Sequence, residues 1–477
     1  MLLTNKPSPM VLLDQFLTLF NNYFYSYILI ILLLGFGLYF SFRTGFVQFR
    51  FFGEQIRAVT EKPDDKKSVS SFQALMLSTA SRVGTGNIIG VSTALCLGGF
   101  GSVFWMWVVA IIGGALAFVE STLAQIFKKR ADDGSYGGPA YYIEAVLKSR
   151  VPGIIFSILL IMTYGVGFNM LTSYNLQSTF SQYSFYNAES SPVIIGLITA
   201  GLVGFCLLGG GKGILNITSV LVPVMGVVYI LTALIVVIMN FGRLPEIFTI
   251  IFKEAFDFRA IFGGFSGSCV MFGIKRGLLS NEAGVGSAPN ASAAAEVSHP
   301  IKQGLVQMLS VSIDTLLICT ATAFMCMCSG VEPSSEISGA EYVQLSVQST
   351  LGSIGPLIIT VAMALFAFTT LIGNIYYVDK CVVYITNRES GKTVRILTRV
   401  MLALLTFVGS VLSADLLWNI ADLTMGFMIV INVPVIAFLS KYVFRALEDY
   451  EKQKKAGVNP VFYVKNITLP YEVDYWK

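Results

Sequence analysis

The stretch from Ser81 to Val91 places groups that can bind a solute inside an apolar segment. It reads Ser-Arg-Val-Gly-Thr-Gly-Asn-Ile-Ile-Gly-Val, so three glycines, two hydroxyls, an amide and an arginine interrupt a potential membrane helix. Polar and charged groups are costly at membrane depth and are therefore functional candidates. Non-helical backbone survives there only where it is buried in protein or lines a cavity. We expect a helix break here, and a second break of the same kind between Gly263 and Gly286.

Two such breaks predict the recognition of a zwitterion and of a small cation. A half-helix that begins inside the membrane presents free N–H groups and a positive dipole end to a carboxylate. Freed carbonyl oxygens can ligate Na⁺. Close helix packing is the alternative role for glycine. Both roles stay open, although Arg82, Thr85 and Asn87 favour a site. The glycines concerned are Gly84, Gly86, Gly90, Gly263, Gly264, Gly267, Gly273 and Gly277.

The composition indicates a polytopic membrane protein. The 477 residues are 55% hydrophobic and only 13% charged, whereas a soluble protein carries about 25% charged residues. The chain has one histidine, His299, which we expect in a cytoplasmic loop. Metal and acid–base chemistry depends heavily on histidine, so the composition does not favour an enzyme. The seven cysteines are scattered and mostly lie in apolar spans, which favours a role as small hydrophobes.

Eleven segments satisfy the requirement of about 20 mostly apolar residues for a membrane helix. Loops 43–70 and 128–150 and the tail from residue 441 are basic, whereas loops 181–190 and 329–353 hold no lysine or arginine. The positive-inside rule therefore predicts an outside N-terminus and a cytoplasmic C-terminus. The predicted spans are 22–42, 71–95, 101–127, 152–180, 191–208, 214–239, 260–287, 303–328, 354–385, 396–413 and 417–440.

The last ten spans divide into two groups of five, each opening with a glycine-interrupted span. Five is odd, so the second group enters the membrane from the opposite side, as in an inverted repeat. Interrupted spans at corresponding positions of two halves are typical of a transporter's midplane site. We therefore expect an all-α membrane protein of eleven helices. Its parts are 1–70 with an extra N-terminal helix, repeats 71–239 and 260–440, and a cytoplasmic tail 441–477.

Several motifs resemble the alanine/glycine:cation symporter family. They are Arg82-Val83-Gly84-Thr85-Gly86-Asn87-Ile88, Gly137-Gly138-Pro139-Ala140-Tyr141-Tyr142, and the long run from Gly277 to Asn290, Gly-Leu-Leu-Ser-Asn-Glu-Ala-Gly-Val-Gly-Ser-Ala-Pro-Asn. The resemblance covers roughly residues 20 to 445. It implies a bacterial inner-membrane symporter of the LeuT-type fold that carries alanine, glycine or a related small amino acid with Na⁺, or in some cases H⁺.

The resemblance also implies site residues at the positions that match. The aromatic-plus-amide pair Phe168-Asn169 belongs to the fourth span, and Gly264 to Gly267 would meet the amino end of the substrate. The implied substrate contacts are Gln73, Thr85, Gly86, Asn87, Phe168, Asn169, Gly264, Phe265, Ser266, Gly267, Phe272, Thr370 and Asn374. The implied Na⁺ contacts are Ala80, Val83, Phe366, Thr369 and Thr370.

The threonine pair and Asn374 each allow an alternative interpretation. Phe366, Thr369 and Thr370 share one helix face because they are spaced i, i+3 and i+4. Threonines in a helix also bond back to their own carbonyls, although the resemblance favours the ion. Many family members have tryptophan where this chain has Asn374, so the pocket could admit a larger or more polar side chain, such as that of glutamine or serine.

Arg82 lies about 11 residues into its span, which places it roughly 16 Å deep. Arg82 is a candidate to bind a substrate carboxylate or to form a structural ion pair, with Glu282 or Glu120 as its partner. Asp314 is expected in a hydrogen-bonded helix contact. Lys275 and Arg276 are expected to face the cytoplasmic vestibule.

Together these features favour a Na⁺-coupled symporter of a small neutral amino acid. It is expected to be monomeric, to lie in lipid and to bind no nucleic acid. The alternatives are a larger polar substrate, proton coupling, a passive channel, or an amino-acid sensor without net transport.

Overall fold

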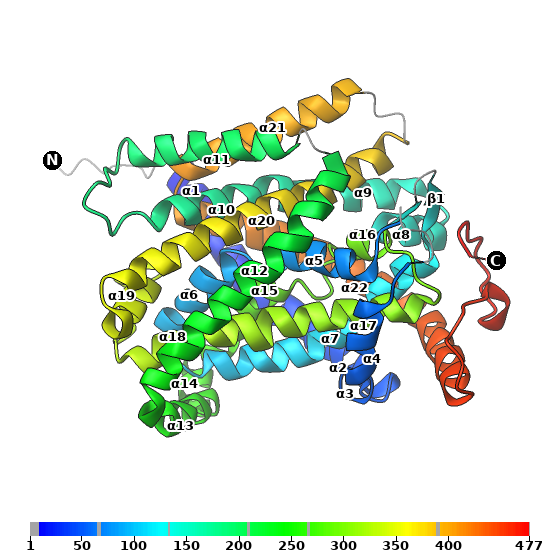
Figure 1. Ribbon diagram of the computed structural model, residues 1–477, viewed down its shortest axis with the longest axis horizontal. Helices are drawn as coiled ribbons and strands as arrows, with labels where there is room; N and C mark the ends of the chain where they lie inside the picture. Colours follow the sequence, from blue (N-terminus) through cyan, green and yellow to red (C-terminus); the bar gives the residue numbers. More distant parts are fainter. Residues whose placement is uncertain are drawn as a thin grey trace.

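The computed structural model describes residues 9–63, 68–131, 134–207, 210–264, 268–387 and 392–476. Most of its helices run side by side from one end of the molecule to the other (Figure 1). One end carries α19 (Ala340–Leu351) and is called the α19 end. The opposite end, the α8 end, carries α8 (Pro139–Leu147) and the C-terminal segment.

Within this described part, seven helical segments are long and apolar enough to cross a membrane, so the chain is a multi-pass membrane protein. Seven of the predicted spans fall on them. The segments are Gln15–Arg43, Ser102–Ile126, Arg150–Ser178, Gly211–Met239, Pro300–Ser329, Ile354–Ile385 and Ala414–Lys455. Three shorter apolar helices are Gly86–Gly98, Ser191–Cys206 and Ile396–Val411. The total of eleven spans remains a prediction.

The first part of the chain begins with helices that precede the first break. These are α1 (Pro9–Tyr23), η1 (Phe24–Leu29), α2 (Ile30–Arg43), α3 (Val47–Arg50) and α4 (Phe52–Thr60). The helices up to the middle of the chain are α5 (Ser71–Arg82), η2 (Gly86–Gly90), α6 (Val91–Gly98), α7 (Ser102–Ile126), α8, α9 (Arg150–Leu160), η3 (Ile161–Gly167), α10 (Phe168–Ser178), α11 (Ser191–Leu207) and α12 (Gly210–Met239).

The second part opens with short helices at the α19 end. They are η4 (Phe241–Arg243), α13 (Leu244–Ala255) and α14 (Phe258–Gly263). The helices that follow are α15 (Cys269–Asn281), α16 (Pro289–Ser292), α17 (Pro300–Val311), η6 (Ser312–Cys319), α18 (Thr320–Ser329), α19, α20 (Ile354–Ile385), α21 (Lys392–Val411), α22 (Ala414–Lys455) and η7 (Val464–Asn466).

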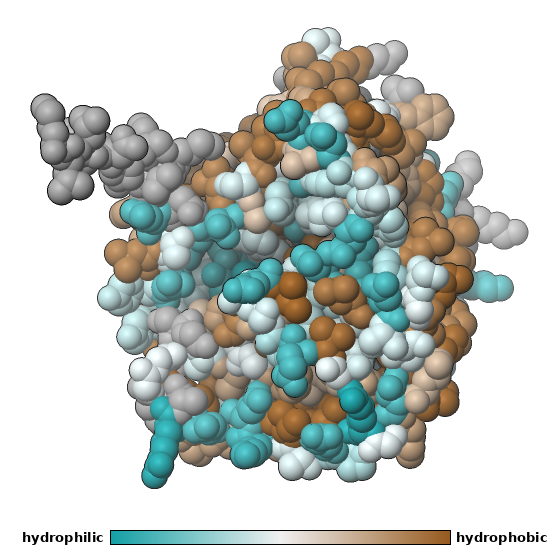
Figure 2. Space-filling model, turned by 90° about the vertical axis from the view of Figure 1, so that its left-hand side faces the viewer, coloured by the Kyte–Doolittle hydropathy of each residue, from teal (hydrophilic) through white to brown (hydrophobic). Residues whose placement is uncertain are grey.

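Large apolar side chains cover the flanks of the helix bundle. Ile31 on α2, Phe205 on α11 and Ile238 on α12 are 68%, 74% and 68% exposed. Figure 2 looks onto the α19 end, where hydrophilic side chains are interspersed with apolar ones and hydrophobic side chains gather along the right-hand edge. An apolar flank beside a more polar end is the surface that a membrane-spanning bundle requires.

The first predicted break is present after α5. The helix ends at Arg82, and Val83 leaves helical geometry with ψ at 87°. The chain resumes its helix at Gly86 as a π-helical turn that continues into α6. A Cβ on Gly84 would overlap the Thr370 hydroxyl on α20. Glycine is therefore favoured here because the Thr370 side chain lies directly against it. The predicted span 71–95 thus consists of two half-helices.

The second break follows α15. Glu282 adopts a left-handed conformation with φ of 53°, and Gly284 and Gly286 have φ of 79° and 89°. Regular helix returns only as the short α16. The expectation that Gly273 and Gly277 belong to the break is wrong, since both lie within α15. A Cβ on Gly273 would lie 2.5 Å from the Ser102 carbonyl oxygen, so this glycine allows α15 to pack against α7.

A two-stranded antiparallel hairpin lies at the α8 end, formed by β1 (Lys129–Ala131) and β2 (Gly134–Tyr136). The C-terminal segment packs beside it. The backbone N–H of Arg130 donates to the Asp474 carboxylate at 2.6 Å, and the indole N–H of Trp476 donates to the Gln125 carbonyl at 2.7 Å. These contacts hold the end of the chain over α7.

Candidate functional site

A small internal cavity of about 40 Å³ lies between the two helix breaks. Water needs roughly 10–15 Å³ of such space, so the cavity suits a few waters or a small solute. Both breaks contribute side chains, together with α10, α20 and α22. The lining residues are Ser81, Arg82, Gly84, Thr85, Gly86, Phe168, Leu171, Thr172, Asn175, Leu279, Glu282, Thr370 and Trp418.

The first break supplies two of the predicted contacts to this cavity, and its Asn87 side chain forms structural hydrogen bonds instead. Thr85 and Gly86 line the cavity as expected. The Asn87 amide turns away: its oxygen accepts from the Gly84 N–H at 2.8 Å, and its nitrogen donates to Asp314 Oδ1 at 2.6 Å. Asn87 therefore fixes the shape of the break and ties it to η6, in the hydrogen-bonded contact that was expected for Asp314.

One face of α10 forms the opposite wall. Phe168, Leu171, Thr172 and Asn175 line the cavity, and the Asn175 amide donates to the Thr85 hydroxyl at 2.9 Å. They are spaced i, i+3, i+4 and i+7, which is one helix face. That spacing could have identified Asn175 from Phe168. Asn169 lies on another face, where its amide donates to the Leu402 carbonyl at 2.9 Å.

Arg82 and Glu282 both line the cavity, one from each break. Arg82 donates weakly to Gln307, at 3.3 Å to the carbonyl oxygen and 3.5 Å to the side-chain oxygen. Its Nε and Nη2 are buried and have no hydrogen-bond partner. Within the described ranges Arg82 forms no ion pair, so the expected direct pairing with Glu282 or Glu120 is absent from this conformation.

Of the predicted cation contacts, Thr370 and Ala80 meet where α5 lies against α20. The Thr370 hydroxyl donates to the Ala80 carbonyl at 3.1 Å, from one helix to the other. The Thr369 hydroxyl bonds back to the Leu365 and Phe366 carbonyls at 3.0 and 3.1 Å. Val83 is buried at the end of α5. Hydroxyl and carbonyl oxygens are the ligands that a hard cation prefers, so this group fits Na⁺.

Other predicted substrate contacts lie outside the cavity lining. Gln73 belongs to a capping box at the start of α5, where it bonds Ser70. Asn374 reaches the cavity only through Ser81, whose hydroxyl donates to it at 2.7 Å. Gly264 is exposed, and Phe272 lies against α6, where a Cβ on Gly98 would meet its side chain. Phe265, Ser266 and Gly267 fall outside the described residues.

A larger cavity of about 600 Å³ opens at the α19 end and shares Asn175 and Trp418 with the central one. Lys275 forms an ion pair with Asp422 at 2.6 Å there, and the Arg276 guanidinium lies 4.0 Å from the centre of the Trp418 ring. Lys275 and Arg276 therefore lie toward the α19 end, and their expected place in a cytoplasmic vestibule remains a prediction.

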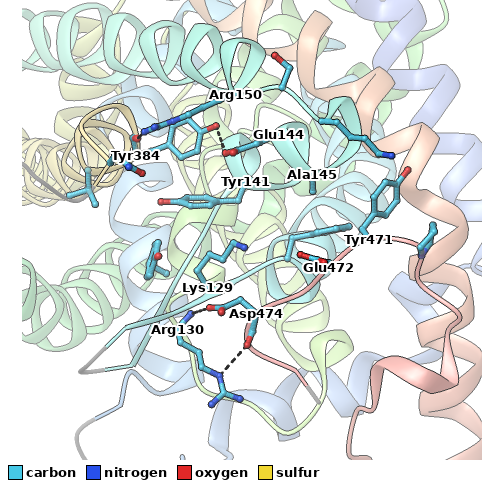
Figure 3. Close-up of a pocket in the computed structure, with 17 residues that line it drawn as sticks. Lys129, Arg130, Tyr141, Glu144, Ala145, Arg150, Tyr384, Tyr471, Glu472 and Asp474 are labelled. Atoms are coloured by element: carbon cyan, nitrogen blue, oxygen red, sulfur yellow. Dashed lines mark hydrogen bonds between the residues drawn. The ribbon is translucent and has the colours of Figure 1, made fainter.

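The cavity at the α8 end, about 1000 Å³, shares no lining residue with the central one (Figure 3). The Tyr384 hydroxyl donates to Glu144 at 2.7 Å beside the Arg150 side chain. Nearby, burial lowers the pKa of Lys128 to about 7, and the Glu296 charge offsets this in part. In this conformation the central cavity shares lining residues with the cavity at the α19 end and none with the cavity at the α8 end.

Two interrupted helices that face each other across a buried polar cavity define a secondary transporter. Residues 10–464 match the sequence pattern of the sodium:alanine symporter family. The chain belongs to this family of amino-acid symporters.

Three relatives illustrate the similarity. The chain is 42% identical to the amino-acid carrier protein AlsT of Bacillus subtilis over 96% of each chain. It is 43% identical to the probable sodium/glutamine symporter GlnT of the same organism, over 95% of this chain and 94% of the relative. It is 35% identical to the sodium/alanine symporter AgcS of Methanococcus maripaludis, over 91% and 96%.

Two solved structures share the LeuT-type fold at low sequence identity. MhsT in complex with L-phenylalanine has a TM-score of 0.56 at 16% identity, covering 84% of this chain and 94% of that one. A Na⁺-coupled sialic acid symporter, in a substrate-bound outward-open state, has a TM-score of 0.51 at 13% identity, over 88% and 93%.

Proposed function

We propose that the protein takes up a small neutral amino acid of the alanine or glycine class together with Na⁺. The observation that carries this proposal is the small cavity where Thr85 and Gly86 of the first break meet Glu282 of the second. Its volume of about 40 Å³ suits a small side chain better than a bulky one. The name of the archaeal relative, a sodium/alanine symporter, agrees with this substrate.

Glutamine or another larger polar amino acid is the second candidate. The substrate named for GlnT supports it, as that relative is 43% identical. Asn374 also supports it, since this polar residue lies directly behind Ser81 in the cavity wall. The volume of the cavity favours the smaller substrate.

Na⁺ would be held by the oxygens of Ala80, Val83, Phe366, Thr369 and Thr370. The cation would bridge α5 and α20, so its binding would stabilise the arrangement in which the first break and α10 form the cavity. A ligand shifts a conformational equilibrium only through a difference in affinity for the two states. Coupling would follow because Na⁺ favours the conformation that also binds substrate.

Transport would proceed by alternating access between two inverted five-helix repeats, 71–239 and 260–440. The conformation described here, adjoining the α19 end, would be the outward-facing one. The basic loops at the α8 end support a cytoplasmic C-terminus by the positive-inside rule. In this proposal the protein acts as a monomer in the bacterial inner membrane, with the N-terminus outside and residues 441–477 as the cytoplasmic tail.

Uptake into proteoliposomes tests the proposal. An inward Na⁺ gradient should drive accumulation of labelled alanine, and unlabelled alanine or glycine should compete better than glutamine. Failure of every amino acid to accumulate under Na⁺ and pH gradients would contradict symport. Better competition by glutamine would replace the substrate and leave the mechanism standing. Counterflow of labelled substrate separates a transporter from a sensor that only binds.

A further inference from the structure

Acidic groups outnumber basic ones around the central cavity. Glu120, Glu282 and Asp314 are 0%, 2% and 0% exposed, and Arg82 is 3% exposed. The field of Arg82 acts on all three carboxyl groups. One guanidinium can balance only one carboxylate, and an unbalanced buried charge is very costly. The other two carboxyl groups must therefore carry protons or lie beside a bound cation.

Asp314 is the carboxyl group best held as an anion. It accepts from the Asn87 amide at 2.6 Å, from the Ser280 hydroxyl at 2.7 Å and from the Thr315 hydroxyl at 2.8 Å. Three donors to one carboxyl group stabilise its charged form. The positive charge of Arg82 is thus matched by Asp314 when no other anion is present.

Glu120 is buried without access to the cavity. Its Oε2 accepts from the Asn432 amide at 3.0 Å, and its Oε1 has no hydrogen-bond partner. It does not line the central cavity. A proton on Glu120 would therefore exchange with the cavity less readily than one on Glu282.

The surroundings of Glu282 favour its protonated form, and its position in the cavity lining lets it exchange a proton. It caps the C-terminal end of α15, where the negative end of the helix dipole disfavours an anion. Its Oε2 accepts from the Ser287 hydroxyl at 2.6 Å, the Tyr164 hydroxyl lies beside the carboxyl group, and the residue lines the cavity together with Arg82. The Nε and Nη2 of Arg82 are buried without a hydrogen-bond partner, so the guanidinium has donors that an anion could satisfy.

We propose that Glu282 binds one proton in the substrate-ready state and thereby leaves Arg82 free for the substrate carboxylate. The proton enters with the substrate from the α19 end. After substrate leaves at the α8 end, Glu282 releases the proton to the water that enters there. This inference rests on the proposed symport function and assigns a titratable group to it.

The surroundings of Glu282 favour a proton over a metal ion. The groups that face it are Arg82 from α5, Tyr164 from η3, Asp314 from η6 and Tyr377 from α20. Tyrosine ordinarily titrates near ~10, so Arg82 and Asp314 are the charged neighbours at neutral pH. Arg82 would repel Na⁺ at this position. In the described part of the chain, no group of three or more histidine, cysteine or acidic residues could hold a metal.

The test compares Glu282→Gln with Glu120→Gln in proteoliposomes at a fixed Na⁺ gradient. Acidifying the outer solution should raise the initial uptake rate of wild type and of Glu120→Gln. Glu282→Gln, which mimics the protonated residue, should lose this pH response and retain counterflow of labelled alanine. An unchanged pH response in Glu282→Gln would overturn the proposal, as would its loss in Glu120→Gln alone.

A measurement on the unmodified protein covers the case in which the variant does not fold. A pH indicator should record proton uptake when alanine is added to the purified protein in weakly buffered Na⁺ solution at alkaline pH. Absence of both this signal and any pH effect on wild-type uptake would refute the role of Glu282, even where Na⁺ drives uptake. If wild type moves no amino acid under any gradient, the proposed function itself fails.

Discussion

The two helix breaks differ in how they are built. The first spans only Val83 to Thr85 between α5 and η2, and is fixed by close packing against α20. The second runs from Glu282 to Ala288, with three residues in the left-handed region. The first is thus a rigid contact suited to a cation between two helices. The second is an extended segment that presents a titratable side chain.

Replacement of Gly84 should have the largest effect, because the first break tolerates no side chain. In Gly84→Ala the new Cβ would overlap the Thr370 hydroxyl. Overpacking costs about 1–3 kcal/mol, so we expect Na⁺-driven uptake to fall about 10- to 100-fold. Gly90→Ala is the matched control, because its Cβ would be 3.9 Å from its nearest neighbour, Arg276 Cδ. Equal effects of both changes would contradict a rigid first break.

In the second break, Gly286→Ala should reduce stability more than Gly284→Ala. Both positions have positive φ, which costs a non-glycine residue about 1–3 kcal/mol. A Cβ on Gly286 would also lie 2.8 Å from Phe156 Cζ, whereas the nearest atom to a Cβ on Gly284 is at 3.4 Å. Thermal unfolding in detergent measures the difference. The reverse order would mean that the second break relaxes freely around Gly286.

Loss of the Thr370 hydroxyl on α20 should weaken the binding of Na⁺. Thr370→Val removes the hydrogen bond to Ala80 across the break. A hydrogen bond contributes about 1 kcal/mol, so we expect the Na⁺ concentration for half-maximal uptake to rise about fivefold. Thr370→Ser should restore it. No change in Na⁺ dependence would place the cation away from this contact.

The smallest expected effect concerns His299, which follows the second break and caps α17. Its Nδ1 accepts from the Ile301 N–H at 3.2 Å. Burial lowers the pKa of His299 below its ordinary value, although Asp449 partly opposes this. The folded state therefore favours neutral histidine, and stability should fall as pH drops below about 6.5.

The melting temperature measured against pH should show this loss of stability in wild type. His299→Asn can still cap the helix, and its melting temperature should depend less on pH. The difference should correspond to less than about 1 kcal/mol in the free energy of unfolding. An unchanged slope would assign the pH dependence to other groups.

Sequence reasoning located the first break and the contact between Ala80 and Thr370, because glycine and hydroxyl residues in apolar spans are conspicuous. It misplaced Gly273 and Gly277, since helix packing and helix breaks use the same residue type. Trp418 was missed because nothing near it in the chain marks it as a cavity residue. The contact between His299 and Asp449 was missed because the two residues lie far apart in the sequence.

Protection of a cysteine by substrate tests whether the central cavity binds the amino acid. Thr172→Cys would be introduced into a variant in which the seven native cysteines are replaced. The new cysteine would be labelled with a small thiol reagent added from the α19 end. We expect alanine to slow labelling in the presence of Na⁺ and to have little effect without it. Labelling that no amino acid alters, in a variant that still transports, would contradict the assignment of this cavity as the substrate site.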